Sequence, residues 1–387
     1  MSKVARLEAF VLTIPRDEPY LGGQHPGEGA NEKGYFVRKR NRTVYPIMDR
    51  TVVLRLETES GVVGWGETYG LVAPQAVLAL INDFMADFVV GRDVFDASVV
   101  HEDLYAMMRF RGYGGGYYLD ALAAIDIAMW DAAGRCAKLP IAKLLGGRRR
   151  TEIPAYVSGL PKPTLQERGE FAAQWQSRGF NMFKFAAPMA VESLAEETAG
   201  LRKALGPDAK IACDMHWNRS AGEAVSEITE MEPHGLWFAE APVATEDMNG
   251  LAEIASKVKT PIAVGEEWRT VFDAQARIDR RAVHIVQPEM GHTGITQFMR
   301  IGLAAQAQNL RIIPHATIGS GIFLAASLQA SCALEGIVAH EFQHSIFGRN
   351  TGLISAGITC ENGHYQIGDG PGLGIEPTAE LIAQLSS

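Results

Sequence analysis

The sequence predicts an α/β protein whose larger part is a (β/α)8 barrel, a modified TIM barrel, preceded by a smaller α+β region. From about residue 150, short apolar runs alternate with segments of helical periodicity. Three of these runs, between residues 209 and 267, each end in a carboxylate, and the carboxylates are 26 residues apart. That spacing is close to the length of one strand–helix unit. The residues before 150 lack this alternation; there the predicted strands come first and the predicted helices follow.

Three strands are predicted in the N-terminal region. Residues 3–14 alternate apolar and polar side chains, as do residues 51–57, and a strand at 61–67 follows across a short turn. Between the first two strands lies a stretch, 15–50, that is rich in Gly, Pro, Arg and Tyr. We expect a long loop there, of the kind that is usually functional or disordered.

Helical periodicity follows the predicted hairpin. It covers residues 74–110 and again 119–137, where Asp120 is placed to act as the N-cap. With the preceding strands, these helices complete an α+β region.

Eight strand–helix units make up the predicted barrel. Helices fill the gaps between the strands, for example at 192–205 and 222–231. After about residue 356 the sequence predicts a further strand, HYQIG, then a Gly-rich turn and a short helix. The predicted barrel strands cover residues 153–158, 181–186, 209–214, 235–240, 260–265, 283–288, 311–315 and 335–340.

Three carboxylates end consecutive predicted strands of the barrel: Asp214, Glu240 and Glu266. The C-terminal ends of barrel strands carry the active site in this fold, so the three side chains should converge. Converging carboxylates repel one another unless a cation lies between them, and oxygen ligands in that number suit Mg2+. The alternative is that each acid stabilises the first turn of a separate helix.

Composition limits the partners and the compartment. The net charge of −9 disfavours nucleic acid or an anionic membrane as a partner. The four cysteines contain no C-x-x-C pair, which argues against a zinc site or a disulfide framework and favours a reducing compartment. The N-terminus lacks the features of a signal peptide, and no apolar run is long enough to span a membrane. We expect a cytoplasmic homo-oligomer that acts on a small molecule.

The chain resembles the enolase superfamily, in its mandelate racemase and muconate lactonizing branch. The resemblance implies one Mg2+ per active site, a capping domain over residues 1–130, a catalytic barrel over 131–355, and a C-terminal segment, 356–387, that returns to the capping domain. Arg135 stands where the branch usually has a lysine. The features that carry the resemblance are the three carboxylates and the segments ALAAIDIAMWDAAGR at 121–135, PIAKLLGG at 140–147 and GDGPGLGIE at 368–376.

A base is expected at the ends of the sixth and seventh barrel strands. IIPHATIG places His315 at the barrel mouth, and IVQPE places Glu289 beside it, 26 residues earlier. A carboxylate bonded to imidazole fixes its tautomer and raises its basicity. The pair resembles the His-Asp dyad of the mandelate racemase group, with Glu in place of Asp. The alternatives are structural roles for either residue.

An acid and a cation are predicted near the metal ligands. His216 lies two positions after Asp214 and so on the same side of an extended strand. This D-x-H pattern resembles sugar-acid dehydratases, in which the histidine protonates the departing hydroxyl; a packed histidine is the alternative. In the second strand, Lys184 matches the first lysine of the family's K-x-K pattern, and Ala186 replaces the second. Lys184 could therefore bind the substrate carboxylate or tune a neighbouring pKa.

Glu341 ends the eighth predicted strand and resembles the family's acidic residue that faces the substrate; if protonated, it could donate a hydrogen bond. Structural roles are expected for His292, His340 and His344. Substrate contacts from the capping region are also expected, because Arg pairs well with a distal carboxylate. The candidates are Arg38, Tyr45, Tyr69 and Arg109, with Tyr20, Arg40, Arg42 and Arg111 as further options.

These residues favour a Mg2+-dependent dehydratase of a sugar acid, an aldarate or aldonate such as galactarate. It would remove the proton next to the carboxylate and eliminate the β-hydroxyl to give a 2-keto-3-deoxy acid. Racemases and epimerases need a base on each face, which Ala186 does not supply, so a racemase, epimerase or cycloisomerase is the alternative. An amidohydrolase would need an H-x-H pair on the first strand, which YVSG at 156–159 lacks. A non-catalytic protein would tolerate loss of ligands or base, and none is lost.

Overall fold

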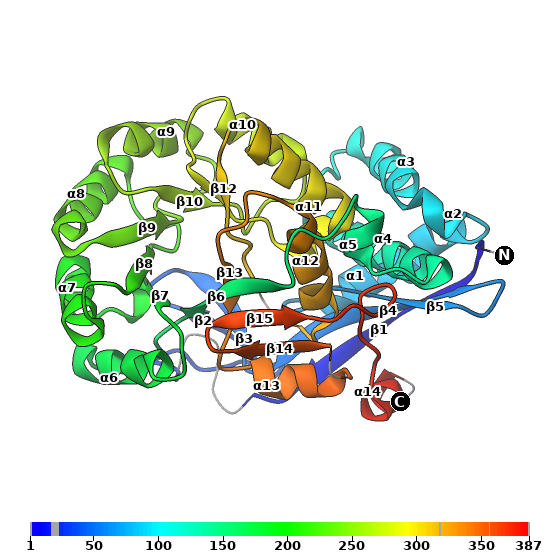
Figure 1. The fold of residues 1–387 in the computed structure, drawn as a ribbon, viewed down its shortest axis with the longest axis horizontal. Helices are drawn as coiled ribbons and strands as arrows, with labels where there is room; N and C mark the ends of the chain where they lie inside the picture. The colour runs from blue at the N-terminus through cyan, green and yellow to red at the C-terminus, as the bar shows by residue number, and fades with distance from the viewer. Residues whose placement is uncertain (1, 17–22, 317–318, 356, 386–387) are drawn as a thin grey trace.

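Within the residues that the computed structural model describes, 2–16, 23–316, 319–355 and 357–385, eight parallel strands form the barrel that the sequence predicts (Figure 1). Neighbouring strands pair from β6 round to β12, and β13 closes the ring by pairing with β6. An isolated bridge between Ile312 and Ile337 joins β12 to the segment before β13. The strands are β6 (Glu152–Ser158), β7 (Met182–Ala186), β8 (Lys210–Asp214), β9 (Leu236–Glu240), β10 (Ile262–Val264), β11 (Ile285–Val286), β12 (Arg311–Ile312) and β13 (His340–Phe342).

A layer of buried side chains fills the inside of the barrel: Tyr156, Ala212, Phe238, Ala263, Ile285, Ile313 and Ala339. Side chains two positions further along a strand point the same way and lie nearer its C-terminal end. Those positions hold Asp214, Glu240, His315 and Glu341. Strand parity therefore places the chemical groups directly above the apolar layer.

Helices surround the barrel strands (Figure 1). Four of them begin with a capping box, in which a Ser or Thr side chain and an acidic residue three positions later satisfy free N–H groups of the first turn. The described barrel helices are α6 (Leu165–Gln176), α7 (Leu194–Leu205), α8 (Ala221–Met231), α9 (Met248–Lys257), α10 (Val271–Ile278), α11 (Met290–Ala307) and α12 (Ile322–Ala333). None of the helices described is both long and apolar enough to cross a lipid bilayer.

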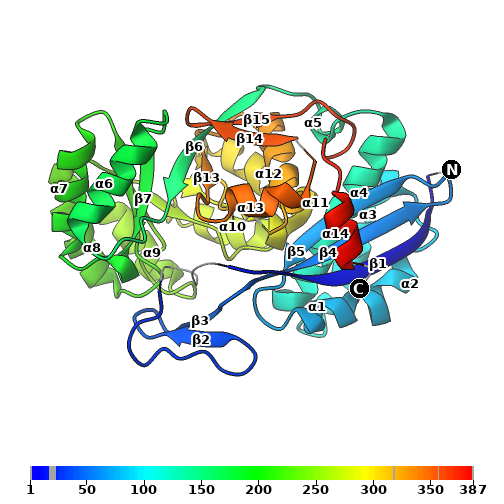
Figure 2. The same ribbon diagram turned by 90° about the horizontal axis from the view of Figure 1, so that it is seen from below.

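The capping domain is built on an antiparallel sheet of β1 (Val4–Ile14), β4 (Asp49–Thr58) and β5 (Val63–Tyr69). The predicted hairpin at β4 and β5 is confirmed. The stretch 15–50 is not all loop, because β2 (Tyr35–Arg38) and β3 (Thr43–Pro46) pair within it as a second hairpin. Figure 2 shows this hairpin below the end of the barrel, apart from the main sheet.

The helices of the capping domain differ in two ways from the prediction. The stretch 74–110 is interrupted: α1 (Pro74–Leu80), a π-helical turn (Ile81–Met85) and α2 (Ala86–Val89) precede a short 3-10 turn (Val94–Asp96) and α3 (Ala97–Arg109). The long helix α4 (Gly116–Ala137) begins before Asp120, with Gly115 at its N-cap. Asp120 is instead buried within the helix and pairs with Arg269 of the barrel.

Helix α4 lies between the capping sheet and the barrel, against β5 and α11. Two glycines of β5 make this approach possible. A Cβ at Gly66 would lie 2.0 Å from the Ala124 carbonyl oxygen, and one at Gly64 would lie 2.4 Å from that of Ala128. The β5 strand is therefore pressed directly onto the helix that joins the two domains.

The C-terminal tail reaches the capping domain by an indirect route. Its hairpin, β14 (Ile358–Glu361) and β15 (His364–Ile367), first extends the barrel sheet, because β15 pairs with the start of β6. The last helix, α14 (Ala379–Leu385), then lies against β1 (Figure 2). Between β13 and the hairpin lie α13 (Phe347–Asn350) and a 3-10 turn (Thr351–Leu353).

Candidate active site

A cavity of about 710 Å³ opens at the C-terminal ends of the barrel strands, under the capping domain. Eight of the residues predicted from the sequence line it, and Glu240 and Glu289 lie buried directly behind the lining. The eight are Lys184, Asp214, His216, Glu266, His315, Glu341, Tyr45 and Tyr69.

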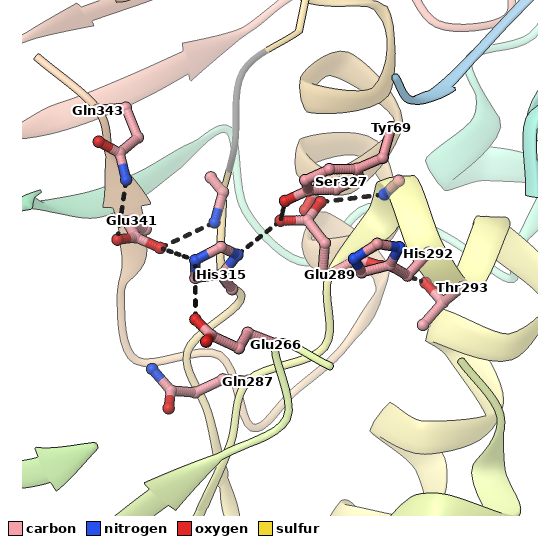
Figure 3. A network of polar contacts seen from close by, with 12 residues as sticks. Tyr69, Glu266, Gln287, Glu289, His292, Thr293, His315, Ser327, Glu341 and Gln343 are labelled. Atoms are coloured by element: carbon pink, nitrogen blue, oxygen red, sulfur yellow. Dashed lines mark hydrogen bonds and ion pairs between the residues drawn. The ribbon is translucent and has the colours of Figure 1, made fainter. Parts of the chain in front are cut away.

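His315 and Glu289 are in direct contact, as predicted (Figure 3). The chain segments that carry them form an isolated parallel bridge, and the Nδ1 atom of His315 lies 2.7 Å from Glu289 Oε2. The other carboxylate oxygen, Oε1, accepts a hydrogen bond from the Gly291 N–H at 3.0 Å. The longer Glu side chain therefore reaches the imidazole while also holding the start of α11.

The second nitrogen of His315 faces two carboxylates. Its Nε2 atom lies 3.1 Å from Glu266 Oε2 and 3.6 Å from Glu341 Oε2. Burial disfavours the charged imidazole, but Glu341, Glu266 and the bond to Glu289 outweigh it and raise the pKa of His315 to about 10. This arrangement therefore favours the protonated imidazole, and drawing a carboxylate away would weaken its hold on the proton.

Asp214, Glu240 and Glu266 lie together at the barrel mouth. Asp214 and Glu240 are register partners on β8 and β9. Burial, together with repulsion from Asp214, Glu341 and Glu266, outweighs the attraction of Lys184 and raises the pKa of Glu240 to about 7. The site is thus rich in oxygen donors and short of positive charge.

Each of the three carboxylates has N–H partners. His216 Nε2 lies 3.1 Å from Asp214 Oδ2, and Trp217 Nε1 donates to Glu266 Oε1 at 2.8 Å. Glu240 accepts hydrogen bonds from Lys184 and from Gln287, both at 2.6 Å. In the described residues, no three acidic, His or Cys side chains are arranged as a ready-made metal cluster. The donor chemistry still fits a hard divalent cation, which would relieve the repulsion that the pKa of Glu240 reports.

His216 faces the cavity for a different reason than strand parity. Strand β8 ends at Asp214, and His216 and Trp217 adopt left-handed backbone angles, with φ of 53° and 58°. The His216 N–H donates to Asp214 Oδ1 at 2.9 Å, which holds this tight turn. Burial lowers the pKa of His216, but the Asp214 carboxylate more than compensates and raises it. Its Nδ1 lies 3.4 Å from Asn41 Nδ2 of the β2–β3 hairpin.

Lys184 is locked as a cation. It is buried, 2.6 Å from Glu240 and 3.1 Å from Glu341, and these carboxylates outweigh burial and hold its pKa well above the usual range. A lysine held in this way is a poor base. Ala186, two positions later, lines the cavity without any ionisable group.

The surroundings of Glu341 favour its ionised form, so the condition for a hydrogen-bond donor role, a protonated carboxyl, is not met in this structure. Burial alone would raise its pKa, but Lys184 and His315 lower it to about 2. Its oxygens accept hydrogen bonds from the Ala316 N–H at 2.9 Å and from Gln343 at 3.2 Å.

The two predicted tyrosines reach the cavity. Tyr45 Oη accepts a hydrogen bond from Asn41 at 2.8 Å, and burial raises the pKa of Tyr45 to about 12. Tyr69 Oη donates to Glu289 Oε2 at 3.0 Å, and its ring stacks on His292 at 4.1 Å.

The structure does not bring Arg38 or Arg109 to the cavity. Arg38 is fully buried and pairs at 3.1 Å with Glu28, which precedes the β2–β3 hairpin. Arg109 lies at the exposed end of α3, with its guanidinium over the rings of Tyr105 and Phe110. Both positions follow from packing partners that the sequence pattern does not show.

The remaining arginine candidates also lie outside the cavity lining. Arg40 donates to the carbonyl oxygens of Pro188 and Ala190, both at 2.8 Å, and so ties the hairpin to the loop after β7. Arg42 and Arg111 are exposed. Tyr20 lies outside the described residues.

Two arginines that sequence reasoning missed do line the cavity. Arg16 follows β1 and Arg349 lies in α13, and each has a nitrogen 3.3 Å from Asp49. Nothing in the local pattern marks either residue. Gln287 was also missed, although strand parity with Glu289 could have identified it.

The three other histidines have structural partners. His292 Nδ1 lies 2.7 Å from Asp120, and His340 Nε2 lies 2.8 Å from Ser327 Oγ. His344 Nε2 lies 2.8 Å from the Gly159 carbonyl oxygen, and its side chain also lines the cavity.

Two family models cover most of the chain. The model described as the mandelate racemase / muconate lactonizing enzyme N-terminal domain matches residues 43–146, and the one described as enolase C-terminal domain-like matches 167–381. Among curated relatives, a D-galactarolactone cycloisomerase from Agrobacterium fabrum is 29% identical, over 86% of this chain and 90% of the relative. A D-galactonate dehydratase from Pectobacterium atrosepticum is also 29% identical, over 89% of this chain and 93% of the relative.

A solved structure is more similar still. A Sinorhizobium meliloti protein, described provisionally as an isomerase, is 60% identical with a TM-score of 0.98, over 99% of each chain. The two matched domains, the closed barrel and the acidic groups at its mouth all indicate the same family. The chain belongs to the enolase superfamily, in its mandelate racemase / muconate lactonizing enzyme branch.

Proposed function

We propose that the protein is a Mg2+-dependent dehydratase of a sugar acid, an aldarate or aldonate of the galactarate type. The observation that carries the proposal is the placement of two imidazoles in one cavity. His216 follows β8, the third strand of the barrel, and His315 follows β12, the seventh. In a ring of eight strands these positions are on opposite sides, so a substrate between them meets a different imidazole on each face.

His315 is the base in this proposal. Its Nδ1 is engaged with Glu289 at 2.7 Å, so Nε2 is the atom that accepts the proton next to the substrate carboxylate. Nε2 must first lose the proton that Glu266, 3.1 Å away, stabilises. A metal bound by Asp214, Glu240 and Glu266 would supply Lewis-acid stabilisation of the charge that develops on the substrate carboxylate. Engagement of Glu266 as a ligand is therefore compatible with a neutral His315.

His216 is the acid. Its proton passes to the β-hydroxyl as the carbon–oxygen bond breaks, and water leaves. The enol that remains becomes the 2-keto-3-deoxy acid. Lys184 stays charged between Glu240 and Glu341 and keeps those carboxylates in place without exchanging a proton.

Sugar-acid chemistry is favoured by the relatives and by the cavity. The two curated relatives are named for D-galactarolactone and D-galactonate. Polar groups from the capping domain and the C-terminal region line the cavity beside the catalytic groups: Arg16, Asn41, Thr43, Tyr45 and Arg349. A polyhydroxylated anion suits this lining.

A cycloisomerase is the second candidate, because one relative at 29% identity carries that name. An epimerase is less well supported. It would need a second base opposite His315. Ala186 and the carboxylate-held Lys184 do not supply one, which leaves His216, the group that this proposal uses as the acid.

The test is an incubation of the purified protein with Mg2+ and a panel of mono- and dicarboxylic sugar acids, including D-galactonate and galactarate. A keto-acid assay follows loss of water, and NMR in D2O follows exchange of the α-proton. We expect a 2-keto-3-deoxy product from at least one acid. Formation of an epimer or a ring isomer without keto acid would overturn the dehydratase proposal.

A further inference from the structure

We propose that β5 of the capping domain holds the His315–Glu289 pair in its working orientation, with Tyr69 as the positioning residue. The inference rests on the proposed function, since it concerns the base of that reaction. It also assigns the capping domain a part in the chemistry, beyond covering the cavity.

The first observation is a shared oxygen. Tyr69 Oη donates to Glu289 Oε2 at 3.0 Å, and the same oxygen lies 2.7 Å from His315 Nδ1 (Figure 3). Glu289 is 1% exposed, and its other oxygen accepts from the Gly291 N–H. The orientation of the buried carboxylate is therefore set jointly by the barrel and by a tyrosine of the capping domain.

The second observation is that the tyrosine itself is fixed. Its ring stacks on His292 at 4.1 Å with 14° between the planes, and lies 5.8 Å from the Phe323 ring. His292 Nδ1 in turn lies 2.7 Å from Asp120 of α4. Asp120 accepts from Arg269 at 2.9 Å, so the stack is anchored to both domains.

The third observation concerns the two residues that precede Tyr69 in β5. The Glu67 carboxylate accepts from the N–H groups of Ser320 at 2.5 Å and Phe323 at 3.1 Å, at the start of the helix that follows His315. Thr68 Oγ1 donates to the Gly291 carbonyl oxygen at 2.5 Å, just after Glu289. Three successive residues of one strand thus hold Glu289 or the segments that follow the two members of the pair.

Removing the Tyr69 hydroxyl should make the orientation of the His315–Glu289 pair less well defined while leaving the base itself in place. Groups that orient a catalytic or ligating side chain through a hydrogen bond typically change activity by about 10- to 100-fold. Tyr69→Phe keeps the ring and its stacking, so we expect kcat to fall about tenfold while KM stays within about twofold. Tyr118→Phe is the matched control, because Tyr118 also donates a buried hydrogen bond in the capping domain, to the Leu104 carbonyl oxygen at 2.5 Å.

The kinetic experiment compares the wild type with Tyr69→Phe and Tyr118→Phe, using D-galactonate and galactarate with Mg2+. Rates of α-proton exchange in D2O and of keto-acid formation are measured, and thermal melts show whether both variants fold. The proposal predicts loss of kcat in Tyr69→Phe alone. Equal kcat in the two variants, or a change confined to KM, would overturn it.

A second measurement needs no substrate. The proton between His315 Nδ1 and Glu289 is expected at low field in the ¹H NMR spectrum, and its assignment is given by its loss in His315→Asn. This signal should shift or broaden in Tyr69→Phe and stay unchanged in Tyr118→Phe. If the wild type dehydrates neither acid, the proposed function fails for those substrates, whereas an unchanged signal in Tyr69→Phe would overturn the positioning role itself.

Discussion

Two buried histidines, one at the barrel mouth and one in the core of the capping domain, have pKa values shifted in opposite directions. Burial disfavours the charged imidazole in both regions. At the barrel mouth, Glu341, Glu266 and Glu289 outweigh burial and raise the pKa of His315 to about 10. In α3, burial and, to a smaller extent, the positive charge of Arg300 lower the pKa of His101 to about 3.

The difference shows what makes the cavity a chemical site. An imidazole buried among apolar side chains stays neutral and only packs. An imidazole buried among carboxylates holds a proton strongly. Any event that draws a carboxylate away from the imidazole lowers its affinity for the proton. Substitution of the carboxylates, the base, the acid and the packed histidine should therefore have effects of decreasing size.

The largest effect is expected from the carboxylates that end β8 and β9 and follow β10. Asp214→Asn, Glu240→Gln and Glu266→Gln should each reduce dehydration by more than about a thousandfold, because each removes an anionic ligand for the cation. Glu253→Gln, the same change on the outer helix α9, should leave the rate unchanged. Turnover near the wild-type rate in the presence of EDTA would contradict the metal-assisted mechanism.

The base comes next. His315→Asn should abolish exchange of the α-proton in D2O and formation of keto acid together, because both begin with the same proton transfer. Glu289→Gln should reduce both by about 10- to 100-fold, since Glu289 orients the imidazole without exchanging the proton. NMR of the substrate in D2O measures the exchange. If His315→Asn exchanges the proton as fast as the wild type, the base lies elsewhere.

His216 distinguishes elimination from proton exchange. A hydroxyl is a poor leaving group and needs a proton, so His216→Asn should reduce water loss by about 100-fold or more. Part of the α-proton exchange should survive, because His315 and its carboxylates remain. A parallel loss of both activities would mean that His216 serves the first proton transfer as well.

The smallest effect concerns the contribution of His101 to the stability of the folded protein. The folded-state pKa of His101, about 3, lies below its usual value of 6.5, so the unfolded chain binds more protons between these pH values. The stability that neutral His101 contributes is present above pH 6.5 and is lost as the pH falls. In urea unfolding, the cost of His101→Gln should therefore shrink by about 1 kcal/mol between pH 6.5 and 5.5. A cost that is independent of pH would show that His101 is not buried as a neutral group.

The sequence alone determined the barrel, the acidic ends of β8 and β9, and the His315–Glu289 pair. These features repeat with the period of a strand or of a strand–helix unit, so the pattern along the sequence is enough to predict them. Because parallel strands align their carboxyl ends, residues 26 positions apart in the chain become neighbours in space. The same regularity placed Lys184 and Glu341 beside each other.

The tertiary structure decided how these groups are held. Tyr69 and Glu289 are 220 positions apart, and no local period connects a capping strand to a barrel strand. The left-handed turn at His216, the burial of Arg38 against Glu28 and the pairing of Asp120 with Arg269 likewise depend on packing partners that pattern does not reveal. The charge state of Glu341 also depends on tertiary structure, because Lys184 and His315 reach its carboxylate only once the barrel has closed.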